Sequence, residues 1–131
     1  MALIINKVKS FTWTVDYEYP DNDDFIEVKF KAVFKRMPQK FLDEMAKKAT
    51  PKKDKNGNEL PLDFDPAELC RKVVIGWEDV FIANEQGIEE AVPFNKENLE
   101  NLLEIPFLSM YLTRSFYTGQ TGKKLKNLEG Q

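Results

Sequence analysis

Apolar and polar residues alternate along most of the first third of the chain. Every second residue from Phe11 to Tyr19 is apolar, and the same holds from Ile26 to Phe34. A period of two is typical of strands that bury one face. Residues 20–24, between the two runs, are proline, aspartate and asparagine, which favour turns. We therefore predict an antiparallel β-hairpin whose aromatic face packs against the rest of the domain.

A first helix is predicted after this hairpin. The apolar residues of segment 41–49 follow helical spacing. Pro38 suits the first turn, because the N–H that proline lacks would have no partner there. Thr50 and Pro51 end the helix, and the polar segment 51–61 predicts a surface loop.

The start of a second helix is specified more closely. Asp65 is a suitable N-cap, and Pro66 then takes the first helical position. Gly76 is predicted to end this helix in the left-handed conformation. The buried side is predicted to consist of Leu69, Cys70, Val73 and Val74.

A second, shorter hairpin and a third helix are predicted next. Residues 80–82 read as a strand, 84–87 as a turn, and 88–92 as the returning strand. Asn95 is a good N-cap, so a helix over residues 96–104 is predicted to follow directly.

The last predicted helix runs from Pro106 to about Tyr117. Gly119 and Gly122 are predicted to end regular structure, which leaves residues 120–131 as a flexible tail. The chain length fits one domain. We therefore predict a single α+β domain over residues 1–119, with an N-terminal antiparallel hairpin, two helices, a second short hairpin and two C-terminal helices.

This last helix carries more apolar surface than one buried stripe requires. Leu108, Leu112 and Phe116 fit such a stripe, whereas Phe107 and Met110 lie beyond it. A helix of this kind is either central in the core or partly exposed for a partner, and both interpretations stay open here. The candidate partner-binding residues are Phe107, Met110, Tyr111, Arg114 and Tyr117.

Composition argues against catalysis. The 131 residues include no histidine and one cysteine, and the formal net charge is −3. Histidine is the commonest general base and metal ligand, so we expect no enzyme, no metal and no cofactor. A single cysteine favours a reducing compartment. The small net charge indicates neither a membrane nor a nucleic acid as partner, and we expect no signal peptide and no membrane span.

The residues that might suggest chemistry each have a simpler explanation. Cys70 lies on the apolar side of a predicted helix and is expected to pack in the core. The pairs at 78–79 and 89–90 are adjacent carboxylates, which point to opposite faces of a strand and cannot converge on one atom. Residues 21–24 lack the length of a calcium loop. The lysines at 52–55 and 123–126 are expected to be solvated, with nucleic-acid binding the weaker alternative.

The central and C-terminal part of the chain resembles a known family. The similarity covers residues 66–128 and rests on a tryptophan-led hairpin, a capped helix interrupted by a proline, an aromatic-rich helix and a lysine-rich ending. The motifs are Trp77-Glu78-Asp79-Val80, Gly87, Val92-Pro93-Phe94, Asn95-Lys96-Glu97-Asn98-Leu99, Pro106 and Gly122-Lys123-Lys124-Leu125-Lys126-Asn127-Leu128. These resemble the tail assembly chaperones of long-tailed, siphovirus-like phages and prophages.

The resemblance implies a non-enzymatic role in the cytoplasm of the bacterial host. Members of that family bind the tape measure protein and keep it soluble and extended, until the major tail protein displaces them as the tail tube polymerises. They often form homo-oligomers, and they are usually absent from the mature virion. The alternative within the same biology is a structural tail-completion or head-tail connector protein that stays in the particle.

Overall fold

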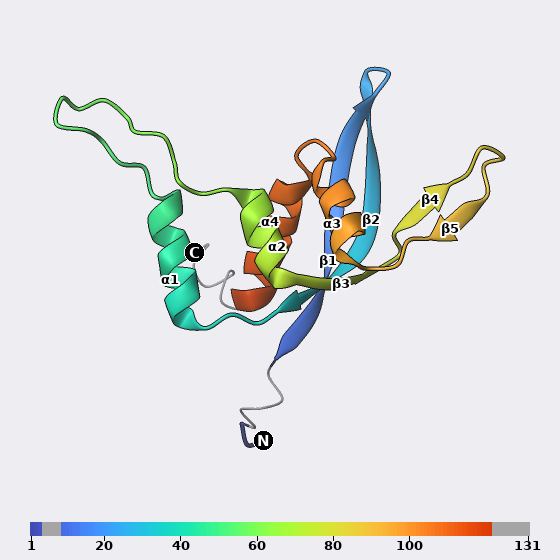
Figure 1. Ribbon diagram of the computed structural model, residues 1–131, viewed down its shortest axis with the longest axis horizontal. Coiled ribbons are helices and arrows are strands. Elements are labelled where there is room, and N and C mark those ends of the chain that lie inside the picture. The colour runs from blue at the N-terminus through green and yellow to red at the C-terminus, as the bar shows by residue number, and fades with distance from the viewer. Residues whose placement is uncertain (4–8, 122–131) are drawn as a thin grey trace.

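A long β-hairpin runs through the middle of the molecule, and the other elements are arranged around it (Figure 1). The computed structural model describes residues 1–3 and 9–121. In chain order the elements are β1 (Ser10–Asp21), β2 (Asp24–Lys35), α1 (Gln39–Ala49), α2 (Pro66–Val73), β3 (Val74–Glu78), β4 (Phe81–Ala83), β5 (Glu89–Ala91), α3 (Lys96–Leu103) and α4 (Leu108–Thr121). The predicted α+β class and its order of hairpins and helices are confirmed.

The first hairpin is longer than predicted and its turn is shorter. β1 and β2 pair antiparallel along their whole length, and Pro20 lies within β1 opposite Phe25. The turn consists of Asn22 and Asp23 alone, whose φ angles are 49° and 68°. Two-residue turns with positive φ match the twist of paired strands, and Asn and Asp tolerate that conformation. The turn was therefore predicted at the correct position, but most of residues 20–24 belong to β1 and β2.

The prediction for Gly76 is wrong. Helix α2 ends at Val73, and the chain passes directly into β3, where Gly76 lies opposite Val33 of β2. This adds a third strand to the sheet, in the order β1-β2-β3. Residues 74–78 are stabilised as a strand by pairing with β2. This contact joins segments distant in sequence, so the local sequence did not reveal it. A Cβ at position 76 would sit 3.4 Å from the Cβ of Val33, which is van der Waals contact between paired strands.

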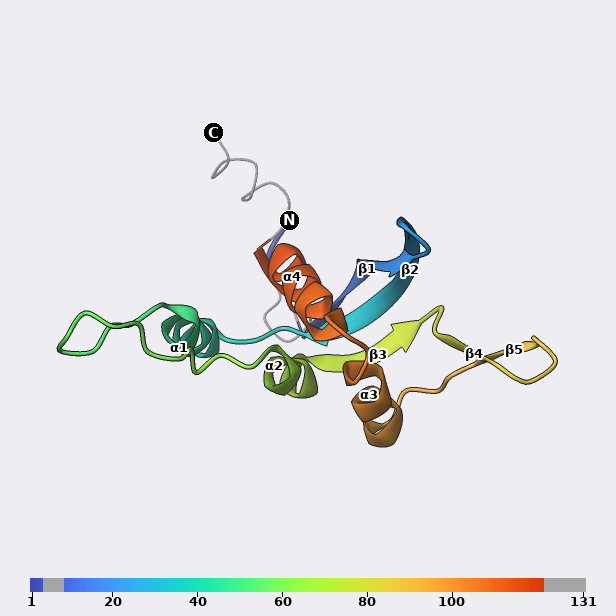
Figure 2. The same ribbon diagram turned by 90° about the horizontal axis from the view of Figure 1, so that it is seen from above.

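The helix boundaries in the first half agree with the sequence. Pro38 directly precedes α1, and Thr50 follows its last residue. Asp65 caps α2 by accepting a hydrogen bond of 3.0 Å from the amide of Ala67. The segment between these helices is an extended loop that projects to one side of the molecule (Figure 2).

The second hairpin and α3 also follow the prediction. β4 and β5 pair antiparallel and project at the opposite end from the α1 loop (Figure 2). The side chain of Asn95 accepts a hydrogen bond of 2.8 Å from the amide of Asn98 and so caps α3.

Helix α4 continues beyond its predicted end. It runs to Thr121, so Gly119 lies inside the helix instead of terminating it. A Cβ on Gly119 would overlap the ring of Phe11, which indicates that glycine allows β1 to approach the helix here. Gln120 and Thr121 belong to α4, and the rest of the predicted tail, with Gly122, lies outside the described residues.

The core lies between the sheet, α2 and α4. Phe116 is central, with ring centroids 5.7 Å from Phe34 and 6.1 Å from Phe11. The fully buried side chains are Val15, Ala32, Phe34, Leu69, Cys70, Val73, Leu108, Leu112 and Phe116. Within the described part of the chain, no helix has the length and apolar character needed to cross a membrane.

Candidate protein-binding surface

Two of the five candidate residues are prominently exposed. Phe107 is 71% exposed and Met110 is 57% exposed, at the start of α4. Phe107 has a φ of 65°, a conformation that a bulky residue rarely adopts, and its carbonyl accepts the amides of Met110 and Tyr111. The tight turn before α4 thus presents an aromatic side chain to solvent.

Of the other three candidates, Tyr111 and Tyr117 lie at the margin of the core and Arg114 is exposed. The ring of Tyr111 meets that of Tyr17 edge-on, with centroids 5.3 Å apart, and the guanidinium of Arg114 lies 5.7 Å from the Tyr111 ring. Tyr117 is half-buried against Phe116, and burial raises the pKa of its phenol above the ordinary value. The structure therefore separates an exposed apolar pair, Phe107 and Met110, from Tyr111 and Tyr117, which also serve packing, and from Arg114, which is exposed beside Tyr111.

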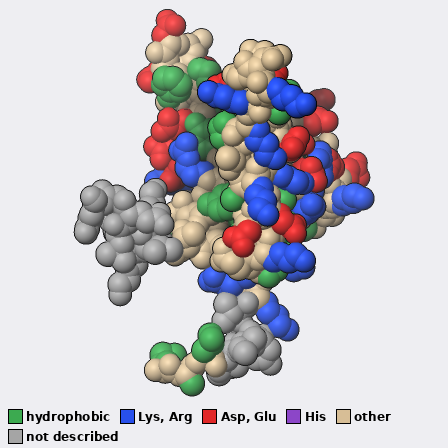
Figure 3. Space-filling model, turned by 90° about the vertical axis from the view of Figure 1, so that its left-hand side faces the viewer, with side chains coloured by type: hydrophobic (Ala, Val, Ile, Leu, Met, Phe, Trp, Pro, Cys, Tyr) green, Lys and Arg blue, Asp and Glu red, His purple; other side chains and the backbone are tan. Residues whose placement is uncertain are grey.

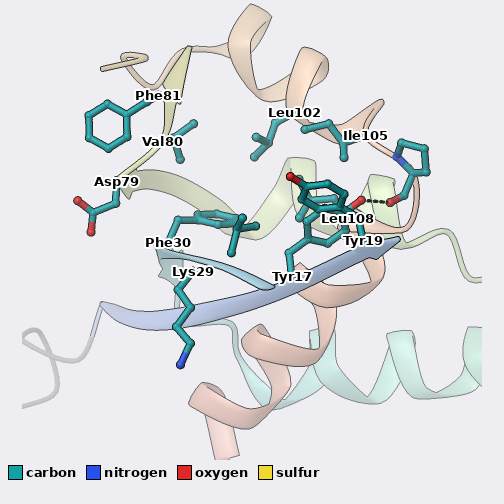
Figure 4. A pocket seen from close by; sticks show the side chains of 12 residues that line it. Tyr17, Tyr19, Lys29, Phe30, Asp79, Val80, Phe81, Leu102, Ile105 and Leu108 are labelled. Carbon is teal, nitrogen blue, oxygen red and sulfur yellow. Dashed lines mark hydrogen bonds between the residues drawn. The ribbon is translucent and has the colours of Figure 1, made fainter. Parts of the chain in front are cut away.

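An apolar groove, not predicted from the sequence, lies beside this exposed pair. Tyr17, Tyr19 and Phe30 form its floor and project from the outer half of the first hairpin (Figure 4). Leu102 and Ile105 point toward them from the α3–α4 side. The cavity measures about 530 Å³, within the range of about 300–1,000 Å³ that is typical of ligand sites.

The remaining wall comes from the segment that joins β3 to β4. Val80 and Phe81 close one end of the groove, while Asp79 and Lys29 stand at its edge and point away from it (Figure 4). Asp79 has a φ of 64°, so the chain turns sharply as soon as β3 ends. That turn directs β4 and β5 away from β2 and leaves the groove open.

Two long-range hydrogen bonds hold the walls in place. The Tyr17 hydroxyl donates to the carbonyl of Pro106 at 2.8 Å, which fixes the α3–α4 connection over the hairpin. The Trp77 indole N–H donates to the carbonyl of Val92 at 2.7 Å, and its ring meets Phe94 edge-on at 4.9 Å. Trp77 thus joins β3 to the segment that leaves β5.

The alternating pattern of the hairpin concealed this groove. The sequence predicts that the whole aromatic face is covered by the domain, and this is wrong for the outer half. Tyr19, Ile26 and Val28 are each more than one-third exposed, whereas Phe30 and Phe34 are buried. Helix α4 covers only the inner part of the hairpin, because the chain reverses before it at Pro106. The sequence did contain one signal of an uncovered part, because the alternating run is longer than a covering helix can span.

The two segments that flank the groove along the chain are acidic. Residues 17–28, in the outer hairpin, contain five carboxylates and no Lys or Arg, and residues 78–91 also contain five and none. Lys29 is the cation among the groove residues, and its ammonium lies 3.7 Å from Asp16 and 3.5 Å from Glu27.

The opposite end of the molecule is different: residues 40–58 contain six Lys against three carboxylates. Lys and Arg side chains are prominent on that face (Figure 3).

The residues that were considered for catalysis, metal binding or nucleic-acid binding are, where the structure describes them, either buried in the core or on the surface. Cys70 is fully buried, and burial raises the pKa of its thiol to about 12, so the thiol stays protonated. The carboxylates at 78–79 and 89–90 are exposed, and the lysines at 52–55 lie in the α1–α2 loop. The lysines at 123–126 lie outside the described residues. Across residues 1–3 and 9–121, no group of three or more His, Cys, Asp or Glu is placed to hold a metal ion.

Comparison with protein-family models, with curated proteins and with solved structures gives no match to this chain.

Proposed function

We propose that this protein is a non-enzymatic phage tail assembly chaperone. In this proposal it binds the tape measure protein in the cytoplasm of the bacterial host and keeps it soluble and extended while the tail tube polymerises. The major tail protein then displaces it, and it is absent from the mature virion. The proposal originates in the sequence resemblance over residues 66–128 and needs no metal or cofactor.

The observation that carries the proposal is the exposed apolar pair at the start of α4. Phe107 and Met110 lie close in sequence to the half-buried Tyr111 and the exposed Arg114, and the turn that carries the pair is held by backbone hydrogen bonds. Methionine and aromatic side chains are enriched where proteins bind apolar helices. A rigid turn that presents both residue types supports reversible binding of an apolar segment.

Modest affinity at each such site is sufficient for this function. A long partner can hold many copies, and linked sites gain effective concentration without any new contact. Surface charge of both signs keeps the unbound protein soluble. These features suit a protein that must release its partner when a polymerising tube replaces it.

Co-expression tests the proposal. The protein is produced together with the long, helix-rich protein encoded nearby, and the soluble yield of that partner is compared with and without this chain. We expect a higher soluble yield and a complex that co-purifies. An unchanged yield with no complex would contradict the chaperone role. Presence of the protein at fixed copy number in purified virions would favour the structural tail-completion or connector role instead.

A further inference from the structure

We infer that the outer half of β2 is a strand-addition site, which binds an extended segment of a partner protein with apolar residues at alternate positions and a cationic residue between them. The bound segment would continue the line of β3 along β2 and place its apolar side chains in the groove. This surface is separate from the exposed pair Phe107 and Met110, so it can bind a segment whether or not the proposed function holds.

The edge of β2 that faces away from β1 is open over its outer half. The pairing of β3 with β2 extends only from Lys31 to Phe34, and no other strand of residues 1–3 and 9–121 pairs with the outer half of β2 on that side. Glu27 and Lys29 are exposed there. An open edge offers unpaired N–H and C=O groups, which can pair with another extended chain.

The register of the hairpin decides which backbone groups face the open edge. Asp21 and Asp24 close the two-residue turn as a hydrogen-bonded pair, and such pairs alternate along an antiparallel ladder. The even-numbered residues of β2 therefore bond β1. The amide of Arg36, just beyond β2, follows the same alternation and donates to the carbonyl of Lys9 at 2.9 Å. The odd-numbered residues of β2 direct their N–H and C=O groups toward the open edge.

The other edge of the outer hairpin, along β1, is less suited to pairing. Pro20 lies opposite Phe25, outside the hydrogen-bonded pairs, so the N–H that proline lacks would face outward from β1. On the β2 side, the amide of Phe25 donates to the Asp24 carboxylate at 2.8 Å, and the backbone groups of Glu27 and Lys29 come next along the edge. A strand can therefore be added beside β2.

A strained residue keeps the next segment of the same chain off this edge. Because Lys31 lies opposite Glu78, an extended continuation of β3 would place Phe81 opposite Val28. Asp79 instead has a φ of 64°, which is uncommon for a non-glycine residue, and directs β4 away. Strain of this kind is concentrated at functional sites. The edge is thus left open although a strand of the same chain adjoins it.

The surroundings specify both faces of the added strand. Its residues opposite even-numbered positions of β2 would face the groove, whose lining is apolar (Figure 4). Its residue opposite Glu27 would lie on the other face of the hairpin, where Glu18 is the direct neighbour of Glu27 and the Lys29 ammonium is shared between Glu27 and Asp16. Like charges directly opposite each other destabilise a sheet, so a cationic residue is favoured there.

A capped synthetic peptide with the sequence Thr-Phe-Lys-Val-Thr tests the site on the full chain. In the register of β3 it sets Phe opposite Val28, Lys opposite Glu27 and Val opposite Ile26. We expect saturable binding in titration calorimetry, and a loss of about tenfold or more in affinity when the peptide Phe is replaced by Asp. Absence of saturable binding up to about 1 mM peptide overturns the inference.

N-methylation of the peptide distinguishes strand addition from apolar contact alone. The amides of its first Thr and its Lys face β2 in this register, so methylating both should weaken binding about tenfold or more. Methylating the Phe and Val amides, which face away from β2, is the matched control and should weaken binding less than about threefold. An equal loss from the two methylated peptides overturns the inference.

Variants of the protein give an independent test. Lys29→Pro removes an N–H that faces the open edge and no hydrogen bond to β1, so it should weaken peptide binding about tenfold or more, whereas Lys29→Ala should bind within about threefold of wild type. Ile105→Glu, in the groove wall, should also weaken binding about tenfold or more. Ile82→Glu is its control, on a side chain that is 63% exposed and outside the groove lining.

Circular dichroism establishes that each variant is folded. Wild-type affinity in a folded Lys29→Pro or Ile105→Glu variant overturns the inference. If Lys29→Pro does not fold, the paired N-methylated peptides measure the same hydrogen bonds on the wild-type protein and decide the outcome.

Discussion

Trp77 illustrates how one side chain can connect separate parts of this fold. It is half-buried at the edge of the core, where its indole N–H donates to the carbonyl of Val92 and its ring meets the ring of Phe94. The indole thus joins β3 to the segment between β5 and α3. Loss of this residue should loosen both the sheet edge and one wall of the groove.

The Trp77→Ala variant should therefore be markedly less stable. We expect a loss of about 3 kcal/mol in the free energy of unfolding, the lower end of the range for large aromatics because Trp77 is only half-buried. Urea titration followed by circular dichroism measures this loss. Trp77→Phe, which keeps the ring but not the N–H, should lose less, and a loss below about 1 kcal/mol for the alanine variant would show that the indole contributes little to packing.

Gly119 should resist replacement although it lies in a helix. Alanine normally stabilises a helix interior by about 1 kcal/mol relative to glycine. Here the added Cβ would overlap the Phe11 ring, which is itself packed against Phe34 and Phe116. We expect Gly119→Ala to lose about 1 kcal/mol or more in the free energy of unfolding, by the same titration. Thr121→Ala, at the exposed end of α4, is the control and should change stability little.

Cys70 should make stability depend on alkaline pH. Burial disfavours the thiolate and raises the pKa of this thiol from its ordinary value of 9.0 to about 12 in the folded protein. Above about pH 9 the unfolded chain loses this proton and the folded chain keeps it, so stability falls as pH rises toward 12. Cys70→Ala removes this contribution. Denaturant titrations at about pH 8 and pH 10.5 should show a smaller decline for Cys70→Ala than for the wild type.

At the scale of elements, α4 has two different ends. Its middle and C-terminal part are buried against β1 and α2, whereas its first turn exposes Met110 beside the exposed Phe107. Both interpretations left open by the sequence therefore apply, each to its own part of the helix. A binding role for the exposed part stays a prediction.

Negative charges introduced at this first turn should weaken partner binding without affecting folding. Phe107→Glu and Met110→Glu should each keep a wild-type circular dichroism spectrum and lose less than about 1 kcal/mol in stability, because both side chains are mostly exposed. Each should reduce the co-purified partner about tenfold or more if the turn contacts it. Leu112→Glu, on the buried side of α4, is the contrasting variant and should unfold the protein. Unchanged partner binding in both exposed variants would remove this turn from the site.

At the scale of the whole molecule, charge and apolar surface are distributed unevenly. The end with the first hairpin tip and β4–β5 is acidic and contains the groove, while the α1 end and its loop are basic (Figure 1). A net charge of −3 conceals this separation.

Partner binding by the exposed pair should be nearly independent of salt. The contact proposed there is apolar, and burial of apolar surface is not screened by ions. We expect less than about a threefold change in affinity between about 50 mM and about 500 mM salt, measured by calorimetry with the purified partner segment. A decline of about tenfold or more over this range would show that charges dominate partner binding.

Local signals in the sequence were sufficient for most of the elements. The first hairpin follows from its alternation, and the caps of α2 and α3 follow from Asp65 and Asn95, because side-chain hydrogen bonds to nearby amides depend only on neighbours in the chain. The burial of Cys70 also follows from helical periodicity, which placed Phe107 and Met110 beyond the buried stripe of α4 but left open whether they are exposed.

The tertiary structure alone decided which apolar surface is covered. β3 forms because β2 offers a free edge to residues distant in sequence, and this is why Gly76 lies in a strand. Gly119 stays helical because Phe11 packs beside it. The groove exists because α4 covers only the inner part of the first hairpin and the turn at Asp79 directs β4 and β5 away from β2, while the alternation of the hairpin is the same whether or not a helix covers it. Periodicity specifies which face of an element is apolar, but contact between distant segments determines how much of that face meets water.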